Sequence, residues 1–167
     1  MPGPAAALLS EHLGERCTLL FMPDDVVRPV DPRYAKADDR VGFADGFPLL
    51  LAARASLDEL NARLDRPVAM DRFRPNLVVE GGDPFEEDRH DHAKVGALVF
   101  RMPKRCARCQ VTMVDQQTAV VGKEPLRTLA RYRTERNKVY FAQNLIPDGE
   151  GTVAVGDEVS YFGSPAV

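Results

Sequence analysis

The order of apolar and polar positions divides the chain into a few helical segments and many short extended ones. An apolar stripe over residues 4–13, bounded by a proline and a glycine, predicts a first helix. Residues 17–22 (CTLLFM) and 48–53 (PLLLAA) have the composition of buried strands. Between them, residues 23–40 are rich in Pro and Asp and have no period, which predicts a functional or mobile loop.

Two local patterns predict backbone detail in the middle of the chain. Ser56 to Glu59 reads as a capping box, which opens a helix with Leu57, Leu60 and Leu64 on its inner face. Further on, Pro75 predicts an extended conformation at Arg74, because a proline ring crowds the residue before it.

The second half of the chain alternates between short strands and turns. A third amphipathic helix is predicted at residues 125–136, and a loop at 116–122. Strands are predicted at 41–43, 77–79, 94–102, 111–113, 139–141, 152–155 and 158–162, with a Gly156-Asp157 turn joining the last two. Many short strands with about three helices indicate a mainly β, α+β domain, a barrel or sandwich with helices outside it. Without a repeat or internal boundary, residues 1–167 form one predicted domain.

Composition narrows the function classes. The chain has 167 residues, 44% of them hydrophobic and 28% charged, as is ordinary for a globular domain. A net charge of -3 argues against a nucleic-acid or membrane-surface partner. Three cysteines suit a reducing compartment rather than a disulfide framework. The apolar run at residues 5–9 lacks the basic flank and length of a targeting segment, so a cytoplasmic location is expected.

The candidate chemistry lies in residues 103–115 (PKRCARCQVTMVD), where Cys106 and Cys109 stand among three cations. These cations are Lys104, Arg105 and Arg108. Neighbouring positive charge favours the thiolate, the form of cysteine that attacks electrophiles and binds metals. This stretch is therefore the first place to look for a site.

Four readings of the two cysteines remain open from spacing alone. They are small core residues, a thiol-redox pair, half of a zinc site completed by His90 and His92, or the source of one thiolate ligand. The zinc reading lacks a second Cys-x-x-Cys pair. The redox reading lacks the helix that such a pair usually opens. The fourth reading suits a metal whose other ligands come from an organic cofactor.

Several motifs together resemble the MOSC domain family, named for the C-terminal domain of molybdenum cofactor sulfurase, and most closely the branch of the mitochondrial amidoxime-reducing component. The resemblance rests on RCARCQVTMVD at residues 105–115 and on five further motifs in the family's order. These are FADGFP at 43–48, ASLDELN at 55–61, RFRPN at 72–76, EPLRTL at 124–129 and VGD at 155–157.

The resemblance implies a closed β-barrel, with a core over about residues 41–163, that binds the molybdopterin-type molybdenum cofactor. It makes Cys109 the metal ligand and the catalytic residue. The same cleft would hold the cofactor through Asp45, Gly46, Arg74, Asn76 and Arg108. The branch reduces small N-hydroxylated substrates with electrons from a redox protein, and the family also carries an association with pyridoxal phosphate.

Departures from the family pattern leave a second function class open. Full-length members carry an N-terminal domain that also grips the cofactor, and this chain is expected to begin after it. The family's Phe-Gly-Gln is Phe141-Ala142-Gln143 here, and its aromatic after Glu-Asp is replaced by His90, beyond Arg89. The alternatives to an oxidoreductase are a binding module that carries cofactor or sulfur without turnover, and a zinc-binding structural protein.

Overall fold

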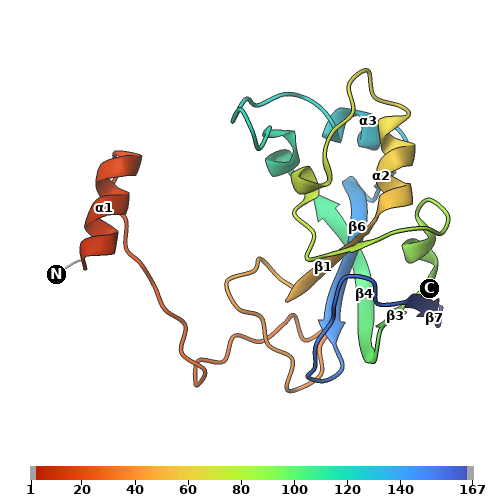
Figure 1. The fold of residues 1–167 in the computed structure, drawn as a ribbon, viewed down its shortest axis with the longest axis horizontal. Helices are drawn as coiled ribbons and strands as arrows, with labels where there is room; N and C mark the ends of the chain where they lie inside the picture. Colours follow the sequence, from red (N-terminus) through yellow and green to blue (C-terminus); the bar gives the residue numbers. More distant parts are fainter. Residues whose placement is uncertain (1–2, 165–167) are drawn as a thin grey trace.

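The computed structural model describes residues 3–164 (Figure 1). Its helical elements are α1 (Pro4–Leu13), α2 (Arg54–Asn61) and α3 (Leu126–Ala130), with three short 3-10 helices, η1 (Met70–Phe73), η2 (Glu86–Arg89) and η3 (Gln110–Met113). The strands are β1 (Leu49–Ala53), β2 (Leu77–Val79), β3 (His92–Val95), β4 (Leu98–Arg108), β5 (Thr134–Glu135), β6 (Lys138–Pro147) and β7 (Val159–Phe162). Within the described residues, no helix is long and apolar enough to cross a membrane.

The strands form one sheet of seven in the order β2-β1-β6-β4-β3-β7, with β5 attached to β6. The first pair, β1 and β2, is parallel, and all other neighbours are antiparallel. No pairing joins β2 to β7 within residues 3–164, so the sheet is an open half-barrel. The mainly β class with three helices is confirmed, whereas the prediction of a closed barrel is wrong.

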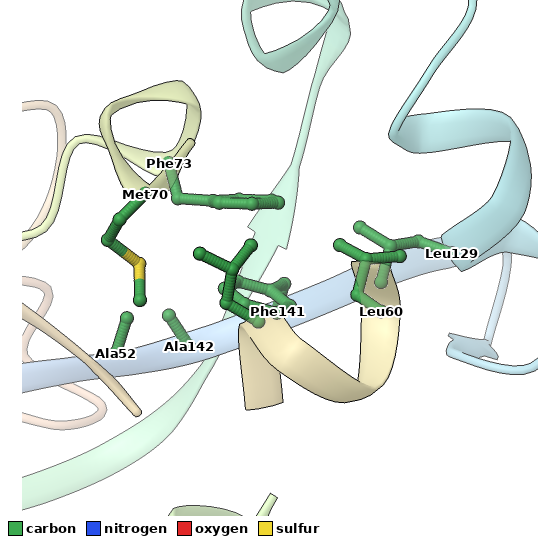
Figure 2. Packing of buried hydrophobic residues seen from close by; sticks show 8 residues of the cluster. Ala52, Leu60, Met70, Phe73, Leu129, Phe141 and Ala142 are labelled. Atoms are coloured by element: carbon green, nitrogen blue, oxygen red, sulfur yellow. The ribbon is translucent and has the colours of Figure 1, made fainter. Parts of the chain in front are cut away.

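The sheet has an apolar cluster on each face, because side chains alternate along its strands. In β1, Leu50 and Ala52 pack with α2, η1 and α3, in the cluster built on Phe73 and Phe141 (Figure 2). Leu49 and Leu51 point the other way, into a cluster with Leu145 that fills the hollow of the half-barrel. In β6, Ala142 has φ 72°, at the position where the family pattern has glycine, and this left-handed residue shifts the alternation between Phe141 and Leu145.

The loop over residues 23–40 is irregular, as predicted, but it is anchored to the sheet. Val30 and Val41 pack on Ile146 in a small third cluster. Asp39 accepts a hydrogen bond from Arg101 at 2.6 Å, and both side chains are almost buried. These contacts fix the end of the loop against β4 and β6, so this part does not behave as a free flap.

The N-terminal arm, residues 3–22, lies apart from the sheet. Its helix α1 has the predicted bounds and buries only Ala6. The strand predicted at residues 17–22 is wrong: this segment forms no β-bridge, and Phe21 is 86% exposed. Figure 1 shows the reason, since the arm extends away from the body and meets no sheet edge of its own chain.

The helix predicted at residues 56–64 begins earlier than its capping-box pattern indicates. α2 starts at Arg54, and its N-cap Ala53 makes no side-chain cap. Ser56 is fully buried in the first turn, where its hydroxyl donates to Glu87 at 2.9 Å instead of capping the helix. The inner face is as predicted for Leu57 and Leu60, which are buried, whereas Leu64 lies beyond the end of the helix at Asn61 and packs on the same cluster.

Other predicted bounds change where tertiary pairing decides them. The strand predicted at 94–102 is a hairpin of β3 and β4 turning at Gly96, and β4 continues to Arg108. Residues 111–113 are the 3-10 helix η3, not a strand. The helix predicted at 125–136 ends at Ala130, because Thr134 and Glu135 pair with β6 as β5. Residues 152–155 form no strand, so the Gly156-Asp157 turn does not close the predicted hairpin.

Candidate functional site

The two candidate cysteines lie at the end of β4, in a segment that we call the cysteine turn, residues 104–115. Cys106 is the third residue from the end of β4 and is half-buried. Cys109 follows the strand as the N-cap of η3 and is exposed. Neither forms a disulfide. The thiol that the family pattern assigns to the metal is thus the accessible one.

Arg108 ties the cysteine turn to η1. Its guanidinium donates to the Phe73 carbonyl at 2.8 Å and to the Cys106 sulfur at 3.0 Å, and it lies 5.5 Å from the centre of the Phe73 ring. The Nε of Arg108 is buried and has no hydrogen-bond partner within the described residues. Arg108 is predicted to hold the cofactor, but two of its five N–H donors hold the turn.

Arg72 holds the other side of the cysteine turn. It donates to the Thr112 carbonyl at 3.1 Å and to the Asp115 carboxylate at 2.9 Å. The buried Thr112 in turn donates its hydroxyl to the Cys109 carbonyl at 3.0 Å. The Thr118 hydroxyl and backbone N–H, with the Arg72 guanidinium, hold the pKa of Asp115 below its ordinary value. Cys109 therefore stands on a backbone fixed at both ends.

Arg74 follows η1 directly and is exposed. The prediction that Pro75 forces it into an extended conformation is wrong, since Arg74 has φ 53° and ψ 47°. This left-handed residue closes the 3-10 helix, and its N–H donates to the Asp71 carbonyl at 3.1 Å. Within residues 3–164 its guanidinium forms no ion pair or hydrogen bond, so it remains free to meet an anion beside the turn.

Asn76 has a structural contact that the sequence reading did not anticipate. Its Oδ1 accepts from the Leu50 N–H at 2.9 Å, and its own N–H donates to the Leu50 carbonyl at 2.8 Å. These two bonds extend the pairing of β1 with β2 beyond the ladder. The Oδ1 atom is therefore committed to the sheet, and the Nδ2 group is the part left for a ligand.

Asp45 and Gly46 lie in an exposed turn before β1. Arg28 clamps this turn, donating to the Gly42 and Ala44 carbonyls and, at 2.9 Å, to the Asp45 carbonyl. Its link to the cysteine turn is through Lys104, whose Nζ lies 5.3 Å from the centre of the Phe47 ring. Among the described contacts, none joins Asp45 or Gly46 to Cys109 or Arg74. Arg108 thus joins the cysteine turn to the backbone just before Arg74, whereas the segment that holds Asp45 and Gly46 meets the cysteine turn, among the described contacts, through Phe47 and Lys104.

The four-ligand zinc site is not formed. His92 pairs with Arg101 across the β3–β4 ladder, five residues before Cys106 on β4, a separation of roughly 17 Å along a strand. His90 stacks on Tyr161 and His92 stacks on Phe162. In the part of the chain that the structure describes, no group of three or more His, Cys, Asp or Glu side chains could hold a metal ion.

Among the described residues, a metal at Cys109 would therefore lack a full set of protein ligands and would need others from a non-protein group. An exposed thiol on a fixed turn, the free Arg74 guanidinium and the unpartnered Arg108 Nε suit a cofactor that presents both a metal and anionic groups. Cys109 would supply the sulfur and Arg74 a cation for an anionic oxygen. Arg72, Thr112 and Asp115 were missed as supports of the site; their place inside the RFRPN and RCARCQVTMVD motifs was the available signal.

Comparison of the sequence with known proteins gives a separate line of evidence on the family of this chain. The chain is 37% identical over 134 residues to mitochondrial amidoxime-reducing component 1 of Homo sapiens, covering 75% of this chain and 40% of that protein. It is 43% identical over 133 residues to mitochondrial amidoxime reducing component 2 of Homo sapiens, covering 72% of this chain and 38% of that one. The molybdenum cofactor sulfurase of Aspergillus niger is 32% identical over 215 residues, covering 95% of this chain and 26% of the sulfurase.

The chain thus spans only a quarter to two fifths of the length of these relatives. Among solved structures, YiiM from Geobacillus stearothermophilus matches with a TM-score of 0.43 and 13% identity, over 71% of this chain and 52% of that one. A likeness at this level says nothing about the chemistry of the site. The sequence pattern that describes the MOSC domain matches residues 38–160, from the end of the anchored loop to β7. The chain belongs to the MOSC domain family.

Proposed function

We propose that this chain is the molybdenum-cofactor-binding domain of an oxidoreductase that reduces N-hydroxylated small molecules. The observation that carries the proposal is the exposed Cys109 thiol on a turn held by Arg72 and by Arg108, which bonds to the carbonyl of Phe73, the residue before the exposed Arg74. The relatives' names, amidoxime-reducing component and molybdenum cofactor sulfurase, supply the cofactor and the substrate class.

When bound, the cofactor supplies a two-electron reduction in which an N-hydroxyl oxygen leaves as water and two protons are taken up. The protein's part is to bind and orient. Cys109 provides the sulfur. The Thr112 hydroxyl holds the Cys109 carbonyl, and Arg72 holds the Thr112 carbonyl in turn, so the backbone that carries the thiol keeps its direction. Arg74 offers a planar pair of donors suited to a phosphate or carboxylate. The electrons come from a separate redox protein, and we place the reaction in the cytoplasm.

Metal analysis of the chain, purified from a host that makes molybdenum cofactor, tests the proposal. We expect molybdenum in the protein, and less of it in Arg74→Ala. Arg89→Ala is the matched control, because Arg89 is 66% exposed and lies 3.9 Å from its partner Asp83. Zinc in place of molybdenum, or neither metal, would refute a molybdenum-cofactor domain.

A second candidate is a module that carries the cofactor without turnover. It is favoured by one observation: among the described contacts, none joins Asp45 or Gly46, which are predicted to line the cleft, to Cys109. An amidoxime offered with a chemical electron donor separates the two functions. Amine formation by molybdenum-loaded protein supports the reductase, and bound molybdenum without amine formation supports the carrier.

A further inference from the structure

The open side of the half-barrel is a groove between the two edge strands. It has a volume of about 1020 Å³ and is lined by residues 76–82, which include β2, and residues 153–161, which lead into and include most of β7. We call this the edge groove. Cys109 and Arg74 do not line it; of the residues predicted to hold the cofactor, Asn76, just before β2, does.

The edge groove offers both unpaired backbone and an apolar floor. Gly96 N–H donates to the Glu158 carbonyl opposite it, at 3.0 Å. Because hydrogen-bonded and non-hydrogen-bonded pairs alternate in an antiparallel ladder, the backbone groups of Val159 and Tyr161 face away from β3, towards the groove. The lining side chains of Val79, Val95, Leu77, Val153, Val159 and Tyr161 belong to the cluster that fills the half-barrel. Such an edge is a template for another strand.

The same chain carries a segment with the complementary properties. Residues 18–22 are extended and form no β-bridge, while Leu19, Leu20 and Phe21 are 57%, 73% and 86% exposed. Their composition is that of a buried strand. Leu8 and Leu13 on α1 are also more than half exposed. The arm thus presents apolar surface that is not covered by other residues in the range 3–164.

We propose that residues 17–22 of a second copy of this chain add a strand in the edge groove, in a reciprocal dimer. A second copy is the occupant because the arm and β7 lie at opposite ends of the long axis of the molecule (Figure 1). In a two-fold pair each arm reaches its partner's groove, and both exposed segments are buried by the same contact. The exchange accounts together for an unpaired strand sequence and an unclosed barrel.

Sedimentation of the full chain, with variants of the arm, tests this. We expect a dimer that becomes a monomer in Leu20→Asp/Phe21→Asp. Neither side chain packs on the body, so the variant should keep the unfolding transition of the fold itself. Val120→Asp is the matched control, because Val120 is 64% exposed but lies in the loop before α3, and it should remain dimeric.

Disulfide trapping identifies the contact. In Ser160→Cys the new thiol lies on β7 in the edge groove, and we expect oxidation to link it to Cys17 of the other copy. Adding Cys17→Ser should abolish the covalent dimer, although Cys106 and Cys109 are still present. A monomeric full chain overturns the proposal. This holds whether amide hydrogen exchange shows the arm to be unprotected or shows it protected by folding back on the groove of its own chain. A dimer that survives Leu20→Asp/Phe21→Asp overturns it as well.

Discussion

The Arg72 guanidinium donates to the Asp115 carboxylate at 2.9 Å, across 43 residues of sequence. The same guanidinium also bonds to the Thr112 carbonyl, so one side chain joins η1 to η3 and to the segment that follows η3. Arg72 therefore holds in place the turn that carries Cys109. The family motif around Arg74 therefore has a structural half, in which the first arginine builds the turn and the second faces outward.

Arg72→Ala is expected to destabilise the fold by about 1–3 kcal/mol, because it leaves the Thr112 carbonyl without its donor. Urea unfolding measures this free energy. Arg89→Ala should change it by about 0–1 kcal/mol, since that exposed arginine is only loosely paired. Equal losses in the two variants would show that the Arg72 contacts do not hold the turn.

Phe141→Ala is expected to cost about 3–5 kcal/mol of stability, as is usual for a buried aromatic side chain. Phe141 is fully buried and stacks on Phe73 with ring centres 3.9 Å apart. Thermal or urea unfolding checks this. Phe43→Ala is the control, because Phe43 is 67% exposed and its loss should cost less than about 0.5 kcal/mol.

Arg101→Met is expected to destabilise by about 3–5 kcal/mol at neutral pH, because it leaves the almost buried Asp39 carboxylate without its partner. Burial alone would raise the pKa of Asp39, but the Arg101 and Lys36 donors outweigh it and lower the pKa. A lowered folded pKa gives stability that is present above the ordinary value of 3.8 and lost as the pH falls through the folded value.

The Arg101→Met penalty should therefore shrink on acidification below about pH 3.8, which urea titrations at several pH values measure. Asp39→Asn should remove this part of the acid dependence. A penalty that stays constant between neutral pH and pH 3 would contradict the ion pair as its source.

Glu87 should show the opposite pH dependence. Burial raises its pKa above the ordinary 4.5, although the Ser56 hydroxyl partly offsets this. The folded state then holds a proton that the unfolded state has lost, so stability falls as the pH rises from 4.5 through the folded pKa. We expect the free energy of unfolding of Glu87→Gln to rise relative to that of the wild type over that pH range, whatever the difference between the two proteins at low pH. Glu150→Gln, at an exposed position, is the control.

The elements that could be predicted were those with local causes. The α1 bounds follow from a flanking proline and glycine, and the α2 inner face follows from leucine spacing. The failures have non-local causes. Ser56 reads as a helix cap, but Glu87, 31 residues away, uses its hydroxyl. Residues 17–22 read as a buried strand because composition reports a preference for strand structure and not whether a sheet edge of the same chain lies within reach.

The candidate site was predictable only in part, for a similar reason. The family motif identified Cys109 and Arg74, and the structure places their segments in contact through Arg108 and Phe73. Matching the motifs could not distinguish the residues that would contact the cofactor from those that only hold the site in place. Asn76 bonds to β1, and Arg72 and Asp115 brace the turn, although all three lie in motifs beside candidate ligands. Which side chain faces outward depends on the backbone angles. At Arg74 the backbone is left-handed, whereas the argument from Pro75 predicted an extended conformation.

The two cysteines of the turn should respond differently to substitution by serine. Serine is similar in size to cysteine, but its oxygen is a harder and far less acidic donor, so it replaces a thiolate on molybdenum poorly. Cys109 is exposed at the end of the turn, whereas Cys106 is half-buried and accepts from Arg108 at 3.0 Å, a bond that a serine oxygen can also accept. Charge in the sequence does not separate them; exposure and contacts do.

In cofactor-loaded protein, we expect Cys109→Ser to lose the thiolate-to-molybdenum absorption band and the reduction of N-hydroxylated substrates. Cys106→Ser should keep both, with a stability loss of at most about 1–3 kcal/mol if its hydroxyl is left without a partner. Absorption spectra, metal content and urea unfolding of the two variants measure these effects separately. Equal loss of the band in both variants would favour a chelating or redox pair. Loss of the band in Cys106→Ser alone would identify Cys106, and not Cys109, as the metal ligand.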